Sequence, residues 1–384
     1  MKRFLKQTLF PLLMCVATPL SAGSFTTTMV ADFDKPWSMT FLPDGRLLVT
    51  ERDGILKLVT LADEPNLGVS STVVVTGLPA VDAGGQGGLG DVALHPNFES
   101  NGWVYLSYAE AGVGDTRGAA VARGRLVEFD DQVKLTDLEV IWRQYPKVFG
   151  RGHYGHRLLF DTSGFLWISS GDRQKFTPAQ DMQSNMGKVL RLNDDGSAPS
   201  DNPFVDHLSV NPLVDDEAVF SQIWSLGHRN PLGMDFDERG NLWEVEMGPA
   251  GGDELNLIMR AANYGYPVVS NGKHYDGRDI PNHDTRPEFP APVITWTPVI
   301  SPGDLMIYRG KQFPWQGNAL VAGLSSKALV RVSLTEPVPR EVERFDMGMR
   351  IRSLVEGADG AIWVLEDERR DSLGRLFKLE WREE

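Results

Sequence analysis

A tight turn followed by an apolar strand recurs along this chain, and no other feature constrains the fold as strongly. Six copies of this unit can be aligned: Leu42–Val49, His95–Leu106, Phe160–Trp167, Phe236–Trp243, Gln316–Val321 and Gly357–Val364. Repeats spaced by some tens of residues are typical of radial blades, in which Asp-Gly chemistry makes the hairpin turn and the next strand packs an aromatic residue between blades. The sequence therefore predicts an all-β, six-bladed β-propeller, although Asp-Gly turns also occur in other β folds.

The rest of the chain gives no sign of a second domain. Short β-rich runs alternate with clusters of Gly, Pro, Asp and Asn, and one short helix is expected at Thr177–Met186. The insertions Asp194–Glu217 and Ser270–Pro292 are expected to be surface loops. We therefore expect a single propeller domain over residues 23–384.

Residues 1–22 have the features of a secretory signal peptide. A basic start precedes the apolar stretch Leu9–Ala17, and Leu20-Ser21-Ala22 ends the segment in the manner of a cleavage site. The apolar stretch is too short to span a bilayer, which takes roughly 20 residues. Cys15, the only cysteine, lies in this segment, so cleavage leaves no thiol for disulfides, zinc binding or catalysis. We expect a periplasmic protein without a membrane span.

The chain is acidic, with 52 Asp and Glu against 38 Lys and Arg and a formal net charge of −14 at pH 7. Such a charge disfavours binding to nucleic acid and to anionic membrane surfaces, so neither is expected as a partner. In an acidic chain, arginines that cluster in loops are expected to serve a local purpose.

A Gly-rich loop with two histidines, Gly152–His156, precedes the strand-like run Leu158–Phe160. A histidine has a pKa of about 6.5 and can accept a proton at neutral pH, and the neighbouring glycines let a ligand approach the backbone. The Asp172 carboxylate could bind and orient such a ring. His153 is therefore a candidate base with Asp172 as its partner, while a structural histidine and an ordinary Gly-Asp turn remain the alternatives. We expect His156 to be structural.

Three further segments could bind an anion. Arg229-Asn230-Pro231 combines a planar guanidinium, suited to carboxylates, with an amide. Arg350 and Arg352 are two positions apart, as residues on one face of a strand are, so both charges lie on the same face. Two like charges so close together are unfavourable unless an anion lies between them. Gln86 lies in a Gly-rich loop that is no nucleotide fingerprint, and its amide could recognise a carbonyl-rich ligand. A salt-bridged turn and a solvated strand edge remain the simpler readings.

The loop from Gly248-Pro249 to Asp253-Glu254 suits a hard cation, because calcium takes oxygen ligands that include backbone carbonyls. The sequence contains no EF-hand spacing, His-rich zinc constellation, Gly-x-Ser-x-Gly elbow beside a helix pattern, or Walker loop. Serine hydrolase chemistry and phosphoryl transfer therefore have no sequence signal.

In the order and spacing of its segments, the chain resembles the soluble quinoprotein glucose dehydrogenases and aldose sugar dehydrogenases that use pyrroloquinoline quinone (PQQ). The matching segments are Pro36–Phe41, Gly85–Leu89, His153–Leu158, Met186–Leu192, Asp201–Pro203, Gly227–Pro231, Asp253–Asn256 and Asn263–Pro267. The resemblance implies oxidation of an aldose at C1 to the lactone, with PQQ and calcium as cofactors and hydride transfer to the quinone. It also implies an electron acceptor, which is unidentified, and a monomer or homodimer.

The resemblance also implies residue roles. His153 would be the general base, supported by Asp172. The residues that would hold the quinone and its carboxylates are Gln86, Arg229, Asn230, Arg350 and Arg352. The carbonyls of Gly248 and Pro249 would bind the catalytic calcium, and Glu254 and Tyr264 resemble the site of a second, structural calcium.

Two departures from the family pattern stand out. Ser325 aligns with a cofactor-binding lysine of the family, so we expect Lys327, two positions on, to supply that cation unless it is solvated. The run Arg173–Lys175, which follows Asp172, is shorter than in the glucose-specific branch, which leaves the preferred sugar open.

Two other functions stay open. A calcium-dependent lactonase-type propeller, a hydrolase, would build its metal site from several side-chain carboxylates and amides, whereas the loop at Gly248 offers backbone carbonyls beside arginines. A non-catalytic propeller that binds a glycan or a protein would be indicated by the loss of His153 or Arg229, and both are present.

Overall fold

The computed structural model describes residues 25–63, 67–206, 217–334 and 338–382. Strands dominate these ranges, which confirms the all-β class. The helical segments are short: α1 (Phe98–Asn101), α2 (Glu217–Ser221), and the 3₁₀ turns η1 (Thr177–Gln180) and η2 (His283–Thr285). Among the described residues, no helix has the length and apolar character needed to cross a membrane. The predicted signal segment, residues 1–22 with Cys15, lies outside the described residues.

Four sheets have four antiparallel strands each. The first sheet consists of β11 (Gly155–Phe160), β12 (Leu166–Ser170), β13 (Lys188–Leu192) and β14 (Ile223–Leu226), and the second of β15 (Pro231–Phe236), β16 (Leu242–Glu246), β17 (Asp253–Ile258) and β18 (Ile294–Trp296). The third consists of β19 (Pro302–Ile307), β20 (Ala319–Gly323), β21 (Ala328–Ser333) and β22 (Arg340–Asp346). The fourth consists of β23 (Ile351–Glu356), β24 (Ile362–Glu366), β25 (Arg375–Trp381) and β1 (Phe25–Asp32).

A nine-stranded sheet holds two further meanders, joined by a short parallel pairing of β5 with β9. Its strands are β2 (Pro36–Phe41), β3 (Leu47–Glu51), β4 (Ile55–Leu61) and β5 (Val69–Thr76); β6 (Leu89–Leu94), β7 (Trp103–Ala111), β8 (Thr116–Phe129) and β9 (Gln132–Arg143); and β10 (Val148–Phe149), which pairs with β8.

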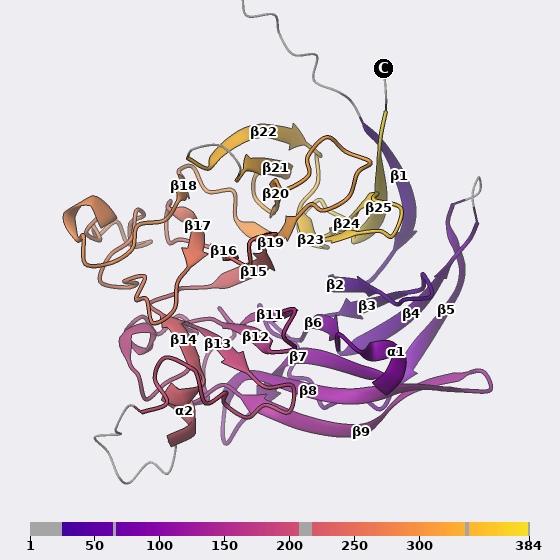
Figure 1. Cartoon of the computed structure of the whole chain (residues 1–384), viewed down its shortest axis with the longest axis horizontal. Helices are drawn as coiled ribbons and strands as arrows, with labels where there is room; N and C mark the ends of the chain where they lie inside the picture. The colour runs from indigo at the N-terminus through magenta and orange to yellow at the C-terminus, as the bar shows by residue number, and fades with distance from the viewer. Residues whose placement is uncertain (1–24, 64–66, 207–216, 335–337, 383–384) are drawn as a thin grey trace, which may run out of the picture.

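The first strands of these meanders form a closed ring. β2, β6, β11, β15, β19 and β23 contact one another in this order, and β23 contacts β2, so the sheets surround one axis (Figure 1). The last sheet takes its outer strand, β1, from the start of the chain and pairs it with β25. The two ends of the described chain therefore meet in one sheet.

Each predicted turn lies between the first and second strands of a meander, and an aspartate often fixes it. Asp161 accepts hydrogen bonds from two backbone N–H groups of its own turn, at 2.8 and 3.0 Å, and from Trp167 Nε1 at 2.9 Å. Asp237 and Trp243 repeat the arrangement, with the indole at 3.2 Å. Trp167 packs against Phe236 of the next sheet, with ring centroids 5.5 Å apart, as predicted for an aromatic residue between neighbouring sheets.

The third residue of each first strand faces a buried polar belt around the axis. These residues are Ser38, Asp91, Arg157, Gly233, Asp304 and Ser353. The Arg157 guanidinium lies 3.3 Å from a carboxylate oxygen of Asp91 and 3.3 Å from one of Asp304. Ser353 Oγ donates to Asp304 at 2.8 Å. Paired charges thus tie three of the first strands together, and the Ser353 hydrogen bond adds a fourth.

The strand order also fixes where the site can be. In each meander the start of the first strand lies beside the end of the second, as the pairs Pro36 with Glu51, Pro231 with Glu246 and Ile351 with Glu366 show. The loops before every first strand and after every second strand therefore gather at one edge of the ring.

Candidate active site

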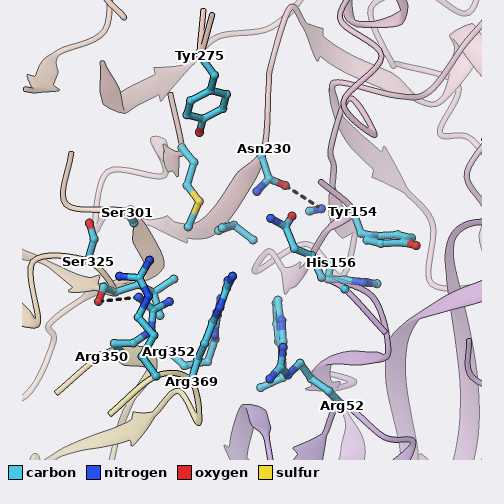
Figure 2. A pocket seen from close by; sticks show the side chains of 18 residues that line it. Arg52, Tyr154, His156, Asn230, Tyr275, Ser301, Ser325, Arg350, Arg352 and Arg369 are labelled. Carbon is cyan, nitrogen blue, oxygen red and sulfur yellow. Dashed lines mark hydrogen bonds between the residues drawn. The ribbon is translucent and has the colours of Figure 1, made fainter. Parts of the chain in front are cut away.

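The loops at this edge enclose a cavity of about 310 Å³, and all the meanders contribute to its wall (Figure 2). Four predicted cofactor residues line it: Gln86, Asn230, Arg350 and Arg352. A second cavity, of about 250 Å³, is lined by His153, Arg229 and Pro249. Tyr275 lines both cavities, so the predicted base and the predicted anion-binding residues lie in neighbouring hollows.

His153 is buried, and its Nδ1 lies 2.7 Å from Asp172 Oδ1. Its backbone N–H donates to Gln86 Oε1 at 2.7 Å. Burial lowers the pKa of His153 and outweighs the Asp172 hydrogen bond, which raises it. The ring is therefore neutral at pH 7, and since Nδ1–H donates to Asp172, Nε2 is left to accept a proton.

His156, for which the sequence predicts a structural role, lines the larger cavity. Its ring is buried and stacks on Tyr154 with the ring centroids 5.2 Å apart. Neither ring nitrogen has a hydrogen-bond partner among the described residues. Burial lowers the pKa of His156 to about 3, so the ring is neutral at neutral pH.

Arg350 and Arg352 share a face as predicted, and a carboxylate of the protein lies between them. Arg350 Nε donates to Asp367 Oδ2 at 2.9 Å, and Arg352 Nη2 donates to Asp367 Oδ1 at 2.9 Å. Burial raises the pKa of Asp367, but the two arginines outweigh it and lower the pKa to about 2. One carboxylate against two guanidinium groups leaves a net positive charge beside the cavity.

Arg229 and Asn230 directly precede β15. Arg229 Nη1 donates to the Gly248 carbonyl at 2.7 Å, and its buried Nε has no partner among the described residues. Asn230 Oδ1 accepts from the Gly155 backbone N–H at 3.3 Å, which links the loops before β15 and β11. The Arg229 backbone N–H is held by Glu246 Oε2 at 2.5 Å.

Lys327 does not line either cavity. Its Nζ donates to Asp371 Oδ2 at 2.5 Å, in an ion pair whose carboxylate side chain is 67% exposed. Ser325, in contrast, lines the larger cavity. The structure therefore does not bring Lys327 to the other predicted cofactor residues.

Three cavity residues that sequence analysis missed are arginines: Arg52, Arg369 and Arg370. Arg52 Nε is buried without a hydrogen-bond partner among the described residues, and Figure 2 shows the Arg52 side chain rising from the opposite wall to Arg350. All three arginines follow the second strand of a meander, the same position as Asp172. That position was the signal that could have revealed them.

The four predicted metal-binding residues line one small hollow: Gly248, Pro249, Glu254 and Tyr264. Its volume of about 10 Å³ is close to that of a single water or ion. The Gly248 backbone N–H is fixed by Asp253 Oδ1 at 2.9 Å. The Tyr264 hydroxyl is engaged by the Leu257 carbonyl and the Met259 N–H, so its phenol oxygen is used within its own turn.

A buried acidic cluster beside this hollow was not predicted. His228, Glu244 and Glu246 each offer a ligand atom within 4.8 Å of the others. Glu246 pairs in register with Glu254 across β16 and β17. Burial and the neighbouring Glu246 raise the pKa of Glu244 and of Glu254 well above the usual range. The sequence feature that could have predicted this cluster is the alternation of Glu244 and Glu246, which places both on one face of a strand.

The whole site can be compared with known proteins. A family model described as Glucose / Sorbosone dehydrogenase matches residues 33–376. The chain belongs to the glucose/sorbosone dehydrogenase family. This member is 36% identical over 379 residues to the aldose sugar dehydrogenase YliI of Escherichia coli (strain K12), with 96% of each chain covered. It is 26% identical over 441 residues to quinoprotein glucose dehydrogenase B of Acinetobacter calcoaceticus, with 91% of this chain and 88% of that one covered.

Solved structures agree with this assignment to the glucose/sorbosone dehydrogenases, which are oxidoreductases. The apo form of the soluble aldose sugar dehydrogenase from Escherichia coli superimposes with a TM-score of 0.81 at 35% identity, covering 94% of this chain and 100% of that chain. The PQQ-bound aldose sugar dehydrogenase of Streptomyces coelicolor shares the fold, with a TM-score of 0.72 at 24% identity, covering 94% of this chain and 99% of that chain.

Proposed function

We propose that this protein oxidises aldose sugars at C1 to lactones, with PQQ and calcium as cofactors and His153 as the general base. The observation that carries the proposal is a buried His153–Asp172 pair beside a cavity lined by five arginines. The names of the two relatives support it, since one is an aldose sugar dehydrogenase and the other a quinoprotein.

The donors of the two neighbouring cavities fit PQQ, a planar molecule with several carboxylates. The Nε groups of Arg52 and Arg229 are buried without partners among the described residues, and an unpaired buried donor is costly. Arg350 and Arg352 carry one more charge than Asp367 neutralises. Carboxylates would satisfy these donors, and Gln86 and Asn230 supply amides for carbonyl oxygens.

The hollow at Gly248 and Pro249 fits calcium, which accepts backbone carbonyl and carboxylate oxygens. Beside that hollow, the buried carboxylates of Glu244, Glu246 and Glu254 support a second cation. Glu244 and Glu254 each have a raised pKa because of burial and the charge of Glu246. A divalent cation would favour their ionised forms and relieve their repulsion.

In the proposed reaction, His153 Nε2 takes the proton of the C1 hydroxyl as the C1–H bond breaks and the C1 carbonyl forms. When bound, PQQ supplies the acceptor for the hydride that leaves C1. Asp172 holds the imidazole in the required tautomer and stabilises its charged form after the proton arrives. Gln86 fixes the loop that carries His153, because its Oε1 accepts the His153 backbone N–H. Arg229 adds positive charge beside the base.

The proposal includes the scaffold and the location. The ring of first strands supports a six-bladed β-propeller over residues 23–384. The composition of residues 1–22 supports export to the periplasm. An external electron acceptor, still unidentified, would complete the cycle, and the protein would act as a monomer or homodimer.

Reconstitution tests the proposal. Purified apoprotein should reduce a dye in the presence of an aldose only after PQQ and calcium are added, and a panel of aldoses would rank the substrates. His153→Ala, loaded in the same way, is the matched control. Equal activity with a nicotinamide cofactor, or no activity with PQQ and any aldose, would overturn the proposal.

A further inference from the structure

The loop after β24 carries two arginines, Arg369 and Arg370, that have no role in the proposed reaction. Both line the larger cavity, and both are exposed to solvent. Within the described ranges, neither guanidinium makes an ion pair or a hydrogen bond. Figure 2 shows Arg369 on the same wall as Arg350 and Arg352. The two arginines therefore border this cavity on its solvent side.

The backbone of this loop is fixed to Arg350. The Asp367 N–H donates to the Arg350 carbonyl at 2.8 Å, and the Arg350 N–H donates to Ser372 Oγ at 3.0 Å. Within the loop, the Arg369 N–H donates to the Asp367 carbonyl at 2.9 Å. Arg370 has a left-handed φ of 63°, an angle that residues other than glycine keep only where the surroundings impose it. The exposed charges thus stand on a well-anchored backbone.

Other exposed cations at this edge of the ring are neutralised by neighbouring carboxylates. Lys35 Nζ pairs with Asp53 Oδ2 at 2.6 Å. Lys327 Nζ pairs with Asp371 Oδ2 at 2.5 Å. The two arginines after β24 differ from these lysines because their charge is left for a molecule that comes from solvent.

Guanidinium charges crowd around the larger cavity. Burial lowers the pKa of Arg52; Asp367 opposes this decrease, and the nearby charges of Arg352 and Arg369 add to it. An anion at the mouth would relieve this repulsion. The chain as a whole has a net charge of −14, so much of its surface would repel an acidic protein. A small anion responds mainly to charges within a Debye length, about 8 Å at physiological ionic strength, and is therefore the better match.

We propose that Arg369 and Arg370 form the docking site of the electron acceptor, and that this acceptor is a small anionic oxidant. The inference rests on the proposed function and names the chemical class of its acceptor. An oxidant bound there lies at the wall of the larger cavity, so electrons need not cross the protein. With ferricyanide, oxidation of one aldose to the lactone releases two electrons and two protons. Two ferricyanide ions each take one electron and become ferrocyanide, and both protons pass to water.

The test uses the full chain loaded with PQQ and calcium, saturating glucose, and two acceptors: anionic ferricyanide and uncharged benzoquinone. Arg369→Gln and Arg370→Gln should each raise the KM for ferricyanide by about 2- to 5-fold, the size expected for one exposed ion pair, and the double variant should raise it further. The KM and kcat with benzoquinone should not change. Arg369→Lys keeps the charge and should keep the ferricyanide KM. Lys311→Gln removes an exposed cation from the turn between β19 and β20, at the opposite edge of the ring, and is the matched control.

Titration with hexacyanocobaltate gives a reading that does not depend on turnover. This anion has the shape and charge of ferricyanide but accepts no electron from the protein, so calorimetry measures its binding directly. Wild type should bind it more tightly than the double variant, while both bind PQQ with the same affinity. Equal binding of hexacyanocobaltate, or a rise of both acceptor KM values together with weaker PQQ binding, would overturn the docking site. Inactivity of loaded wild type with every aldose and both acceptors would instead overturn the proposed function, and the hexacyanocobaltate titration would still decide whether the anion site exists.

Discussion

Replacing Asp172 with Asn tests the buried pair directly. The carboxylate accepts hydrogen bonds from His153 Nδ1 at 2.7 Å and from the backbone N–H groups of Gln174 and Phe176 at 2.9 and 3.2 Å. The amide has one acceptor oxygen and no charge to stabilise the imidazolium that forms when His153 takes the proton. A hydrogen bond to a charged group contributes about 1.5–3 kcal/mol, and about 1.4 kcal/mol is a tenfold change in rate. We therefore expect kcat to fall by about 10- to 100-fold.

The pH profile separates this effect from a general loss of structure. Burial holds the pKa of His153 below 6.5, and the Asp172 hydrogen bond offsets part of that decrease. Wild-type kcat/KM should therefore rise with pH through a pKa below 6.5 and stay level at neutral pH. In Asp172→Asn the plateau should fall while the acidic limb moves to lower pH. Steady-state dye reduction across the acidic and neutral range measures both, and Asp284→Asn, an exposed carboxylate outside both cavities, is the control. An unchanged plateau, or a limb at higher pH, would refute the reasoning.

Three other outcomes are expected. His153→Ala should lower turnover by about 10²–10⁴-fold, the usual contribution of a general base, while the affinity for PQQ in a titration stays unchanged. His156→Ala should lower turnover much less. Equal losses of turnover in the two variants would return His153 to a structural role. Arg52→Met should weaken PQQ binding by about 10- to 100-fold in a fluorescence titration. Lys327→Met should not weaken it, because Lys327 pairs with Asp371. Weaker PQQ binding in Lys327→Met but not in Arg52→Met would contradict the placement of Arg52 in the cavity and of Lys327 outside it. Removal of calcium with a chelator should lower Tm in calorimetry, since buried carboxylates lose their counter-charge, and an unchanged Tm would argue against the metal.

The fold class was predictable because its signals are local. The Asp161 turn and the following Trp167 lie within a few residues of each other, and their hydrogen bond forms inside one hairpin. The shared face of Arg350 and Arg352 was equally predictable from strand alternation. Their partner Asp367 was not, because it comes from the loop after β24, and only the register of β23 and β24 brings it there.

The direction of long side chains was the least predictable property of the site. Lys327 and Ser325 are neighbours in sequence, but an ion pair with Asp371 turns the lysine away from the cavity. Arg52 enters the cavity from a meander distant in sequence, and the sequence signal for it is its position directly after the second strand of that meander. The acidic cluster behind Gly248 likewise depends on the pairing of β16 with β17.

The pairing of β1 with β25 has a consequence for how the protein is made. Thr26 Oγ1 donates to the Glu380 carbonyl at 3.2 Å across 354 positions of sequence, whereas each meander is built from adjacent segments. Contacts of low sequence separation form early, and long-range closure is slow. We therefore expect the ring to close last, once both ends of the chain are free to meet. Until then β25 presents an open edge, which is a template for aggregation. Versions of this protein that are shortened at an end, or held so that β1 cannot reach β25, should consequently fail to fold because of kinetic trapping. They should do so although every catalytic residue is still in the chain.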